Sequence, residues 1–217
     1  MPGLPVMLNL RGQRCLIVGG GPVAIRRARA LIEAGCDQVI IVAPKIEPQL
    51  RQMPVKIEQR TVRESDLAEV RLIVLATNDS AVNERMAKQA RALGVLVNRA
   101  DDAVESEVTF MSQSHHGPIT LAIDTGSAMP DVARAIRDEL ASALDSDWSA
   151  ILEIAGPCRQ IIRRAFCDPS QRRERITRLT DATAIATFKT QGPRAYRELC
   201  SSLCNPAFAL PSVVALA

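Results

Sequence analysis

Residues 15–24 of the chain read Cys-Leu-Ile-Val-Gly-Gly-Gly-Pro-Val-Ala. The first four residues are apolar without alternation, which is typical of a strand that is buried on both faces of a sheet. Three glycines end this run, and apolar residues at helical spacing continue from Val23 to Ala34, before Gly35. The stretch therefore predicts a strand, a tight glycine turn and a helix in direct succession.

The glycine turn fits the pattern G-x-G-x-x-A of dinucleotide-binding turns. Gly19 permits the tight turn, Gly21 lets the backbone approach a pyrophosphate, and Ala24 allows the helix to pack closely on the strand. The N-terminus of the helix adds unpaired N–H groups and a partial positive charge, both of which favour a phosphate. We therefore predict a dinucleotide site at the turn formed by Gly19, Gly20 and Gly21.

The chain continues to alternate between short apolar runs and helical segments up to about residue 98. Further strands are predicted at residues 39–42, 55–58, 72–75 and 95–98, with a helix at about residues 81–93. Because strands joined through helices run parallel, this pattern predicts an α/β fold with a Rossmann-type, doubly wound parallel sheet. Ligands of such sheets bind at the carboxyl ends of the strands.

The pattern changes after residue 100. Residues 107–111 and 119–123 are predicted to form a hairpin, with the sequence His-His-Gly-Pro at residues 115–118 as its turn. Paired histidines would suit metal delivery, although in such a turn exposed residues without that role are more common. A helix is predicted from Pro130 to about Leu144, and the remaining chain has the apolar spacing of an α-helical region.

Composition and charge exclude several classes of protein. With 47% hydrophobic residues and a formal net charge of +3, the 217-residue chain is expected to fold around a substantial core. Aromatic residues make up only 3%, so a nucleic-acid partner that stacks bases on the protein is not expected. None of the six cysteines forms a Cys-x-x-Cys pair, so no metal site is predicted. We find no signal peptide and no apolar run near ~20 residues, so we predict a cytoplasmic protein that binds no membrane.

The end of the second strand lacks the acidic residue that usually binds the ribose hydroxyls. This position reads Val-Ala-Pro-Lys at residues 42–45. Lys45 could instead bind a 2′-phosphate, so the residues themselves leave NAD and NADP open. At the end of the fourth strand, Thr77, Asn78 and Asp79 either line the nicotinamide side of the site or cap the next helix.

Two adjacent carboxylates, Asp101 and Asp102, follow the fifth strand at the edge of the sheet where ligands bind. They could be solvated turn residues. A carboxylate at this position, beside the nicotinamide pocket, also suits a proton acceptor. Because successive residues of an extended segment alternate faces, Asp101 is expected to point into the cleft and Asp102 outward.

Several motifs occur in the order found in precorrin-2 dehydrogenases, the family that includes the N-terminal part of siroheme synthases. The chain resembles this family over about residues 5–145 and more loosely beyond them. Residues 124–131 depart from the family's Ser/Thr-Gly-Gly-x-Ser-Pro turn, because Ser127 and Met129 replace its second glycine and its serine. The matching motifs are residues 15–24, Glu33-Ala34-Gly35, Ala76-Thr77-Asn78-Asp79, Val82-Asn83, Val97-Asn98 and Asp101-Asp102.

The resemblance implies an NAD-dependent oxidation of precorrin-2 to sirohydrochlorin, on the route to siroheme or cobalamin. Some members also insert ferrous iron into the product, which would make iron a second substrate. The family's essential aspartate falls on Asp101, and its dinucleotide contacts fall on Pro22, Val23, Pro44 and Lys45. Family members form homodimers that interlock through the segments after the dinucleotide-binding domain.

These features together predict four regions and one leading function. The regions are a dinucleotide-binding domain at residues 1–112, a dimerisation segment at 113–146, a helical C-terminal domain at 147–205 and a flexible tail at 206–217. The leading function is an NAD-dependent oxidoreductase in which Asp101 accepts or relays a proton. Two alternatives stay open: a chelatase that has lost the oxidation, and a non-catalytic module that senses dinucleotides.

Overall fold

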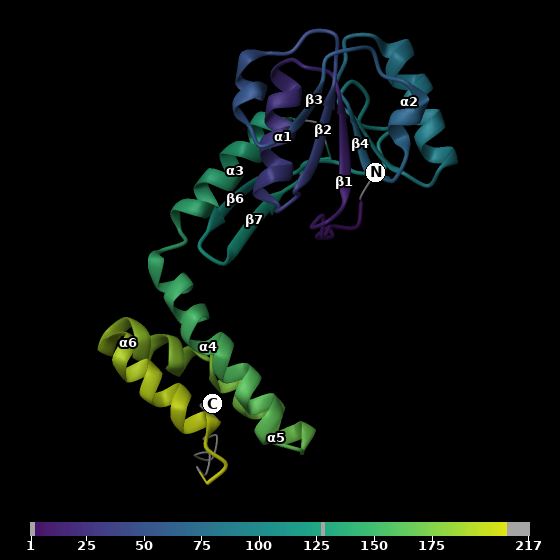
Figure 1. Ribbon diagram of the computed structural model, residues 1–217. Helices are drawn as coiled ribbons and strands as arrows, with labels where there is room; N and C mark the ends of the chain where they lie inside the picture. Colours follow the sequence, from purple (N-terminus) through teal and green to yellow (C-terminus); the bar gives the residue numbers. More distant parts are fainter. Residues whose placement is uncertain (1–2, 127–128, 208–217) are drawn as a thin grey trace. The chain divides into compact units, whose positions relative to one another are not determined.

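The computed structural model describes residues 3–126 and 129–207 of the chain (Figure 1). The chain divides into two compact units, Met1–Phe110 and Met111–Ala217, and each is considered on its own. The first unit contains a parallel sheet, and the second contains a hairpin and helices. The finer division of the second unit stays a prediction, and residues 208–217 of the predicted tail lie outside the described residues.

The first unit contains a five-stranded parallel sheet, which confirms the predicted Rossmann-type α/β fold. The strand order is β3-β2-β1-β4-β5, so the connection changes direction between β1 and β4, where ligands of such sheets bind. The strands are β1 (Arg14–Val18), β2 (Gln38–Val42), β3 (Lys56–Glu58), β4 (Val70–Leu75) and β5 (Leu96–Arg99). They are connected by α1 (Pro22–Glu33), α2 (Ser80–Ala92) and the short 3-10 helices η1 (Pro48–Gln52) and η2 (Glu64–Leu67).

Helices cover both faces of this sheet, and successive side chains of a strand pack against opposite faces (Figure 1). In β1, Cys15 and Ile17 pack in the core that contains α1, while Leu16 and Val18 pack in the core that contains α2. None of these four residues is more than 2% exposed. These four positions therefore have to be apolar, because neither face of the strand meets solvent there.

The predicted strand at residues 107–111 is wrong. Its first residues lie against β5, where the backbone N–H groups of Glu107 and Val108 both donate to the carbonyl oxygen of Val97. The Glu107 carboxylate in turn accepts the backbone N–H of Val97, at 2.8 Å. The Glu107 side chain thus accepts an N–H group of β5 that a neighbouring strand would bind through its backbone carbonyl. Residues 107–111 therefore form no regular strand beside β5.

The hairpin of the second unit consists of β6 (Ser112–His116) and β7 (Ile119–Ile123), which pair antiparallel. The second predicted strand is therefore confirmed, whereas its partner is residues 112–116 in place of the predicted 107–111. His115 and His116 belong to β6 and not to the turn, which is made by Gly117, with a φ of 58°, and the residue after it. Glycine suits this position because its φ is positive.

After the hairpin, the described part of the second unit is mainly helical, as predicted. Its core contains the fully buried Tyr196, whose hydroxyl donates to the carbonyl oxygen of Leu179 at 2.6 Å and whose ring meets Phe188 edge to face. Within the described residues, no helix has the length and apolar character needed to cross a membrane. The helices are α3 (Pro130–Ser142), α4 (Ser146–Ala165), α5 (Pro169–Arg178) and α6 (Ala182–Cys204).

Candidate active site

A cavity of about 790 Å³ lies at the carboxyl ends of β1, β2 and β4. Its walls are the ends of these strands and the loops that follow them, as the topology of the sheet predicts. Thr61, Val62 and Arg85 also line it, and sequence reasoning alone does not single them out. All ten residues proposed for cofactor binding line this one cavity: Gly19, Gly20, Gly21, Pro22, Val23, Pro44, Lys45, Thr77, Asn78 and Asp79.

The three glycines of the turn have different reasons to be glycine. A Cβ on Gly19, where φ is 125°, would overlap the backbone carbonyl of Ala76, and a Cβ on Gly20 would overlap that of Lys45. These two glycines are thus required by neighbouring backbone. A Cβ on Gly21, in contrast, would meet no protein atom within 4 Å. The space beside Gly21 is therefore open to a ligand.

Helix α1 begins directly at this turn, with Pro22 in its first turn. Proline is favourable there because its φ suits a helix and its missing N–H would have had no partner. The first turn of α1 contains no acidic side chain, so the partial positive charge of the helix end is not neutralised there. Together with the open space at Gly21, this end of the helix fits the pyrophosphate of a dinucleotide such as NAD.

The loop after β4 both lines the cavity and begins α2. The Asp79 carboxylate caps the helix, because it accepts the backbone N–H groups of Ala81 and Val82 at 3.0 and 3.1 Å. The Thr77 hydroxyl donates to Oδ1 of the fully buried Asn83 at 2.7 Å, and Nδ2 of Asn83 donates to the Thr77 carbonyl at 3.1 Å. The capping role of Asp79 is thus visible, and a contact of this loop with nicotinamide stays a prediction.

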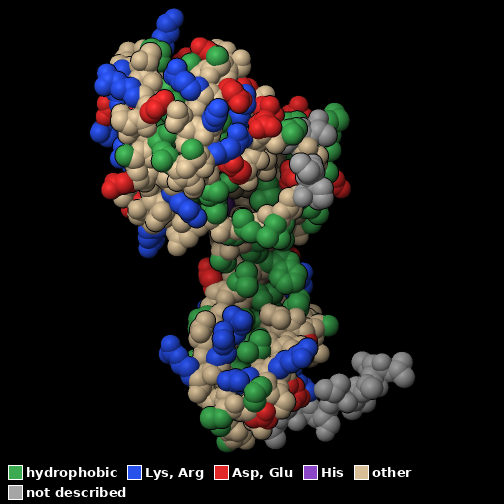
Figure 2. Space-filling model, turned by 90° about the vertical axis from the view of Figure 1, so that its right-hand side faces the viewer, with side chains coloured by type: hydrophobic (Ala, Val, Ile, Leu, Met, Phe, Trp, Pro, Cys, Tyr) green, Lys and Arg blue, Asp and Glu red, His purple; other side chains and the backbone are tan. Residues whose placement is uncertain are grey.

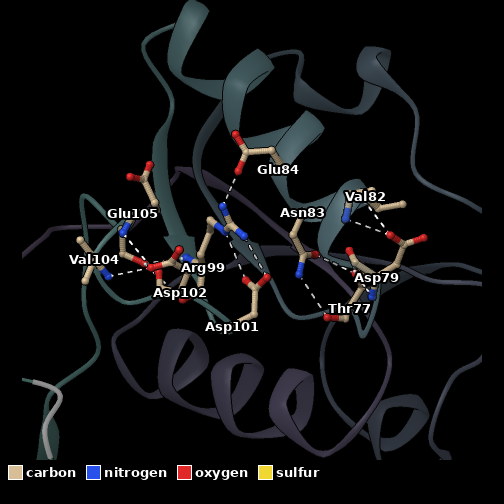
Figure 3. A network of polar contacts seen from close by, with 12 residues as sticks. Thr77, Asp79, Val82, Asn83, Glu84, Arg99, Asp101, Asp102, Val104 and Glu105 are labelled. Atoms are coloured by element: carbon tan, nitrogen blue, oxygen red, sulfur yellow. Dashed lines mark hydrogen bonds and ion pairs between the residues drawn. The ribbon is translucent and has the colours of Figure 1, made fainter.

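The two carboxylates after β5 have different surroundings (Figure 3). Asp101 forms a two-pronged ion pair with Arg99, whose Nε and Nη2 donate to it at 3.2 and 3.0 Å. Asp102 instead accepts the backbone N–H groups of Val104 and Glu105, at 3.0 and 3.1 Å. Asp102 therefore closes a local turn, whereas Asp101 pairs with the last residue of the strand.

Asp101 lies beside the cavity and is not among the described residues that line it. The pKa of its carboxyl is lowered, mainly by the hydrogen bonds from Arg99 and further by a hydrogen bond from the side chain of Asn83. Asn83 also binds Thr77, which does line the cavity. Asp101 is thus not part of the cavity wall as described, and its catalytic role stays a prediction.

Arg99 and Asn83 have roles that the motifs do not predict, although the position of each residue in the sequence indicates that it needs a partner. Asn83 shares a face of α2 with the buried Met86, Ala87 and Ala90, and a polar side chain at such a core position needs a partner. Arg99 stands two residues before Asp101, and residues at this spacing in an extended segment share a face. The sequence thus indicates that Asn83 needs a polar partner, which is Thr77, and that Arg99 can pair with Asp101.

The paired histidines contact other side chains of the hairpin. Nδ1 of His115 lies 3.1 Å from Oγ1 of Thr120, and Nε2 of His116 lies 3.2 Å from Oγ of Ser114. In residues 3–126 and 129–207, no three His, Cys, Asp or Glu side chains are placed together so that they could hold a metal ion. The side chain of each histidine therefore contacts a hydroxyl group of the hairpin.

Comparisons with known proteins agree on one family. Residues 6–112 match a protein-family model described as "Putative NAD(P)-binding". The precorrin-2 dehydrogenase of Priestia megaterium is 32% identical over 180 residues, which are 81% of this chain and 88% of that protein. A solved structure titled "SirC, precorrin-2 dehydrogenase" is similar with a TM-score of 0.73 and 27% identity, over 92% of this chain and 99% of that chain.

Siroheme synthases are similar to the chain as well. That of Chromobacterium violaceum is 36% identical over 177 residues, which are 80% of this chain and 37% of the synthase. That of Nitrosococcus oceani is 34% identical over 177 residues, or 80% of this chain and 38% of the synthase. The chain thus spans little more than a third of the length of these synthases.

Proposed function

The chain belongs to the precorrin-2 dehydrogenase family, and from this premise we propose that it oxidises precorrin-2 to sirohydrochlorin with NAD⁺ as the oxidant. In the balanced reaction, precorrin-2 loses one hydride and one proton, and the products are sirohydrochlorin, NADH and H⁺. The observation that supports the proposal most is the glycine turn with open space at Gly21. The chain that contains this turn matches 88% of the length of a precorrin-2 dehydrogenase.

The residues of the chain contribute binding, orientation and a proton acceptor. Bound NAD⁺ supplies the hydride acceptor. The turn at Gly19–Gly21 and the N-terminus of α1 bind the pyrophosphate, which fixes the direction of the cofactor in the cavity. Asn83 holds Thr77 in the cavity wall, Arg99 holds Asp101, and Asp101 accepts or relays the proton. The protein therefore acts through positioning and electrostatics.

Incubation of the purified chain with precorrin-2 and NAD⁺ under anaerobic conditions tests this proposal. We expect NADH and sirohydrochlorin to form in equal amounts, as followed by their separate absorption spectra. Omission of precorrin-2 is the control for NADH that forms by other routes. Binding of NAD⁺ without any turnover would contradict the proposal and would support the alternative of a module that senses dinucleotides.

We expect NAD⁺ to be preferred over NADP⁺. Lys45 lines the cavity and would attract a 2′-phosphate, but Glu47 lines it as well and would repel that group. We expect kcat/KM to be at least about tenfold higher with NAD⁺, which corresponds to about 1.4 kcal/mol. Measurement of kcat/KM with both cofactors, in the intact chain and in Lys45→Ala, checks this. A tenfold preference for NADP⁺ that is lost in Lys45→Ala would show that Lys45 reads the phosphate.

We infer further that two copies of the chain associate through α3. Val132, Ile136 and Leu140 are exposed and four residues apart, so they form an apolar stripe along one face of this helix. Ile136→Asp is expected to convert dimers to monomers in sedimentation velocity experiments, whereas Arg134→Asp, on the opposite face of α3, should not. A native chain that sediments as a monomer at every concentration would contradict the inference.

Insertion of ferrous iron into sirohydrochlorin is proposed as a second activity, supported by the similarity to siroheme synthases. Ferrous iron would be a substrate of this step, and the two protons of sirohydrochlorin's inner nitrogens would leave as it enters. Addition of ferrous iron to the completed anaerobic oxidation tests the step. Conversion of the sirohydrochlorin spectrum to that of siroheme, faster than without protein, is the expected result, and an equal rate would contradict it.

A further inference from the structure

A buried arginine lies between two carboxylates at the end of β5 (Figure 3). The side chain of Arg99 is only 7% exposed, compared with 61% for Glu84 and 29% for Asp101. Its Nη1 donates to Glu84 at 2.5 Å, while Nε and Nη2 donate to Asp101. The guanidinium is therefore fixed on both sides, by α2 through Glu84 and by its own loop through Asp101.

Asp101 is held by Arg99, which α2 in turn holds through Glu84. Arg99 donates to the Asp101 carboxylate from the end of β5, and Glu84 of α2 accepts a hydrogen bond from the other side of the same guanidinium. The fully buried Asn83, also of α2, further lowers the pKa of the Asp101 carboxyl. Asn83 is itself fixed by Thr77, which lines the cavity. Thr77 and Asn83 thus lie between the cavity wall and the surroundings of Asp101, and the carboxylate itself is held by Arg99. Arginine pairs of this two-pronged kind are geometrically specific.

We propose that Arg99 is a positioning residue for the oxidation, because it holds the Asp101 carboxylate in one orientation beside the dinucleotide cavity. This inference rests on the proposed function, in which Asp101 accepts the proton. A carboxylate offers about four lone-pair directions, and a two-pronged arginine uses two of them. The remaining directions stay available to a proton or an N–H group of the substrate.

The pair also determines the charge of Asp101. Arg99 lowers the pKa of the Asp101 carboxyl. The other charged groups nearby are Glu84, which contacts the far side of the guanidinium, and Asp102, which faces the backbone of Val104. If the ionised form of Asp101 is the active one, activity falls as pH drops through the pKa of Asp101. Removal of Arg99 should raise this pKa and move the acid limb of the kcat profile to higher pH.

The test compares Arg99→Met and Arg99→Lys with a matched control, Arg60→Met. Arg60 forms a similar two-pronged pair with Asp66, at 2.8 and 2.7 Å, elsewhere in the first unit and outside the cavity wall. In Arg99→Met we expect kcat to fall by about 10–100-fold, since misplacement by about 1 Å can cost 10²-fold. The KM for NAD⁺ should change little, and Arg99→Lys should recover part of the loss. Arg60→Met should keep the native kcat and the native pH profile.

A second measurement does not depend on activity. The Asp101 carboxyl is titrated by carbon NMR in labelled protein, with its signal assigned by its loss in Asp101→Asn. We expect its pKa to rise in Arg99→Met and to stay unchanged in Arg60→Met. If Arg99→Met does not fold, Arg99→Lys supplies the same comparison, because it keeps the charge and loses the two-pronged geometry. In Arg99→Lys we expect the pKa of Asp101 to stay near its native value, because the charge is kept, while kcat falls because the two-pronged geometry is lost.

The outcomes separate this inference from the proposed function. A folded Arg99→Met variant with native kcat and native pH profile would overturn the positioning role, provided that Asp101→Asn is inactive. Full activity in Asp101→Asn would overturn it in another way, since the oxidation would then not use that carboxylate. Failure of the native chain to oxidise precorrin-2 would contradict the proposed function, while the NMR titration would still report on the Arg99–Asp101 pair itself.

Discussion

Replacement of Gly21 with valine is expected to abolish NAD⁺ binding and to leave the fold intact. The protein has room for the new side chain, because a Cβ on Gly21 meets no protein atom within 4 Å and the φ of −95° suits any residue. The added methyl groups would instead fill the space that the pyrophosphate needs. Calorimetry should show a loss of affinity of at least ~100-fold, about 2.7 kcal/mol. The melting temperature and far-UV circular dichroism should stay close to native values.

Two further variants of the turn sharpen this test. Gly21→Ala should weaken binding less than Gly21→Val, because its single methyl group fills less of the space. Gly20→Ala should lower the melting temperature, because its Cβ would overlap the backbone carbonyl of Lys45 and the loop would have to shift. If Gly21→Val binds NAD⁺ as tightly as the native chain, the cofactor does not lie on this turn and the assigned site is wrong.

The first unit could be predicted from sequence because its constraints are local. A strand with core on both faces needs buried apolar residues in succession, as β1 has from Cys15 to Val18, and Gly19 is required by the backbone that passes beside it. The segment at 107–111 was predicted wrongly because its apolar spacing is that of a strand. Its actual structure depends on the Glu107 side chain and its hydrogen bond to Val97, a tertiary contact that periodicity does not report.

The cavity wall could be predicted as well, because a parallel sheet brings the loops after β1, β2 and β4 to one edge. The surroundings of Asp101 could be predicted only in part. Its two-residue spacing from Arg99 places both side chains on one face of an extended segment. The contact of Arg99 with Glu84, however, depends on how α2 packs against the end of β5, and residues in separate elements leave no fixed spacing in the sequence. The pair of Asp101 with Arg99 is therefore the part of its surroundings that the spacing indicates, and its catalytic role stays a prediction.

Asp101→Asn is expected to lower kcat by about 10²–10⁴-fold, the usual contribution of a general base. Asparagine keeps the size of the side chain and removes its charge, so a proton can no longer be accepted there. The KM for NAD⁺ should change little, because Asp101 lies outside the cavity wall. Steady-state kinetics with precorrin-2 measure kcat, and calorimetry with NAD⁺ shows whether the cavity is intact.

Asp102→Asn is the matched control for this variant, since it makes the same chemical change at the next residue. The Asp102 side chain accepts the backbone N–H groups of Val104 and Glu105, and an asparagine oxygen can accept them too. Its kcat should therefore stay within about tenfold of the native value, well short of the ~10²-fold loss of a general base. A larger loss of kcat in Asp102→Asn than in Asp101→Asn would show that Asp102 is the proton acceptor. Native kcat in both would make Asp101 a structural partner of Arg99, and the proton would then have to leave precorrin-2 to solvent or to another group.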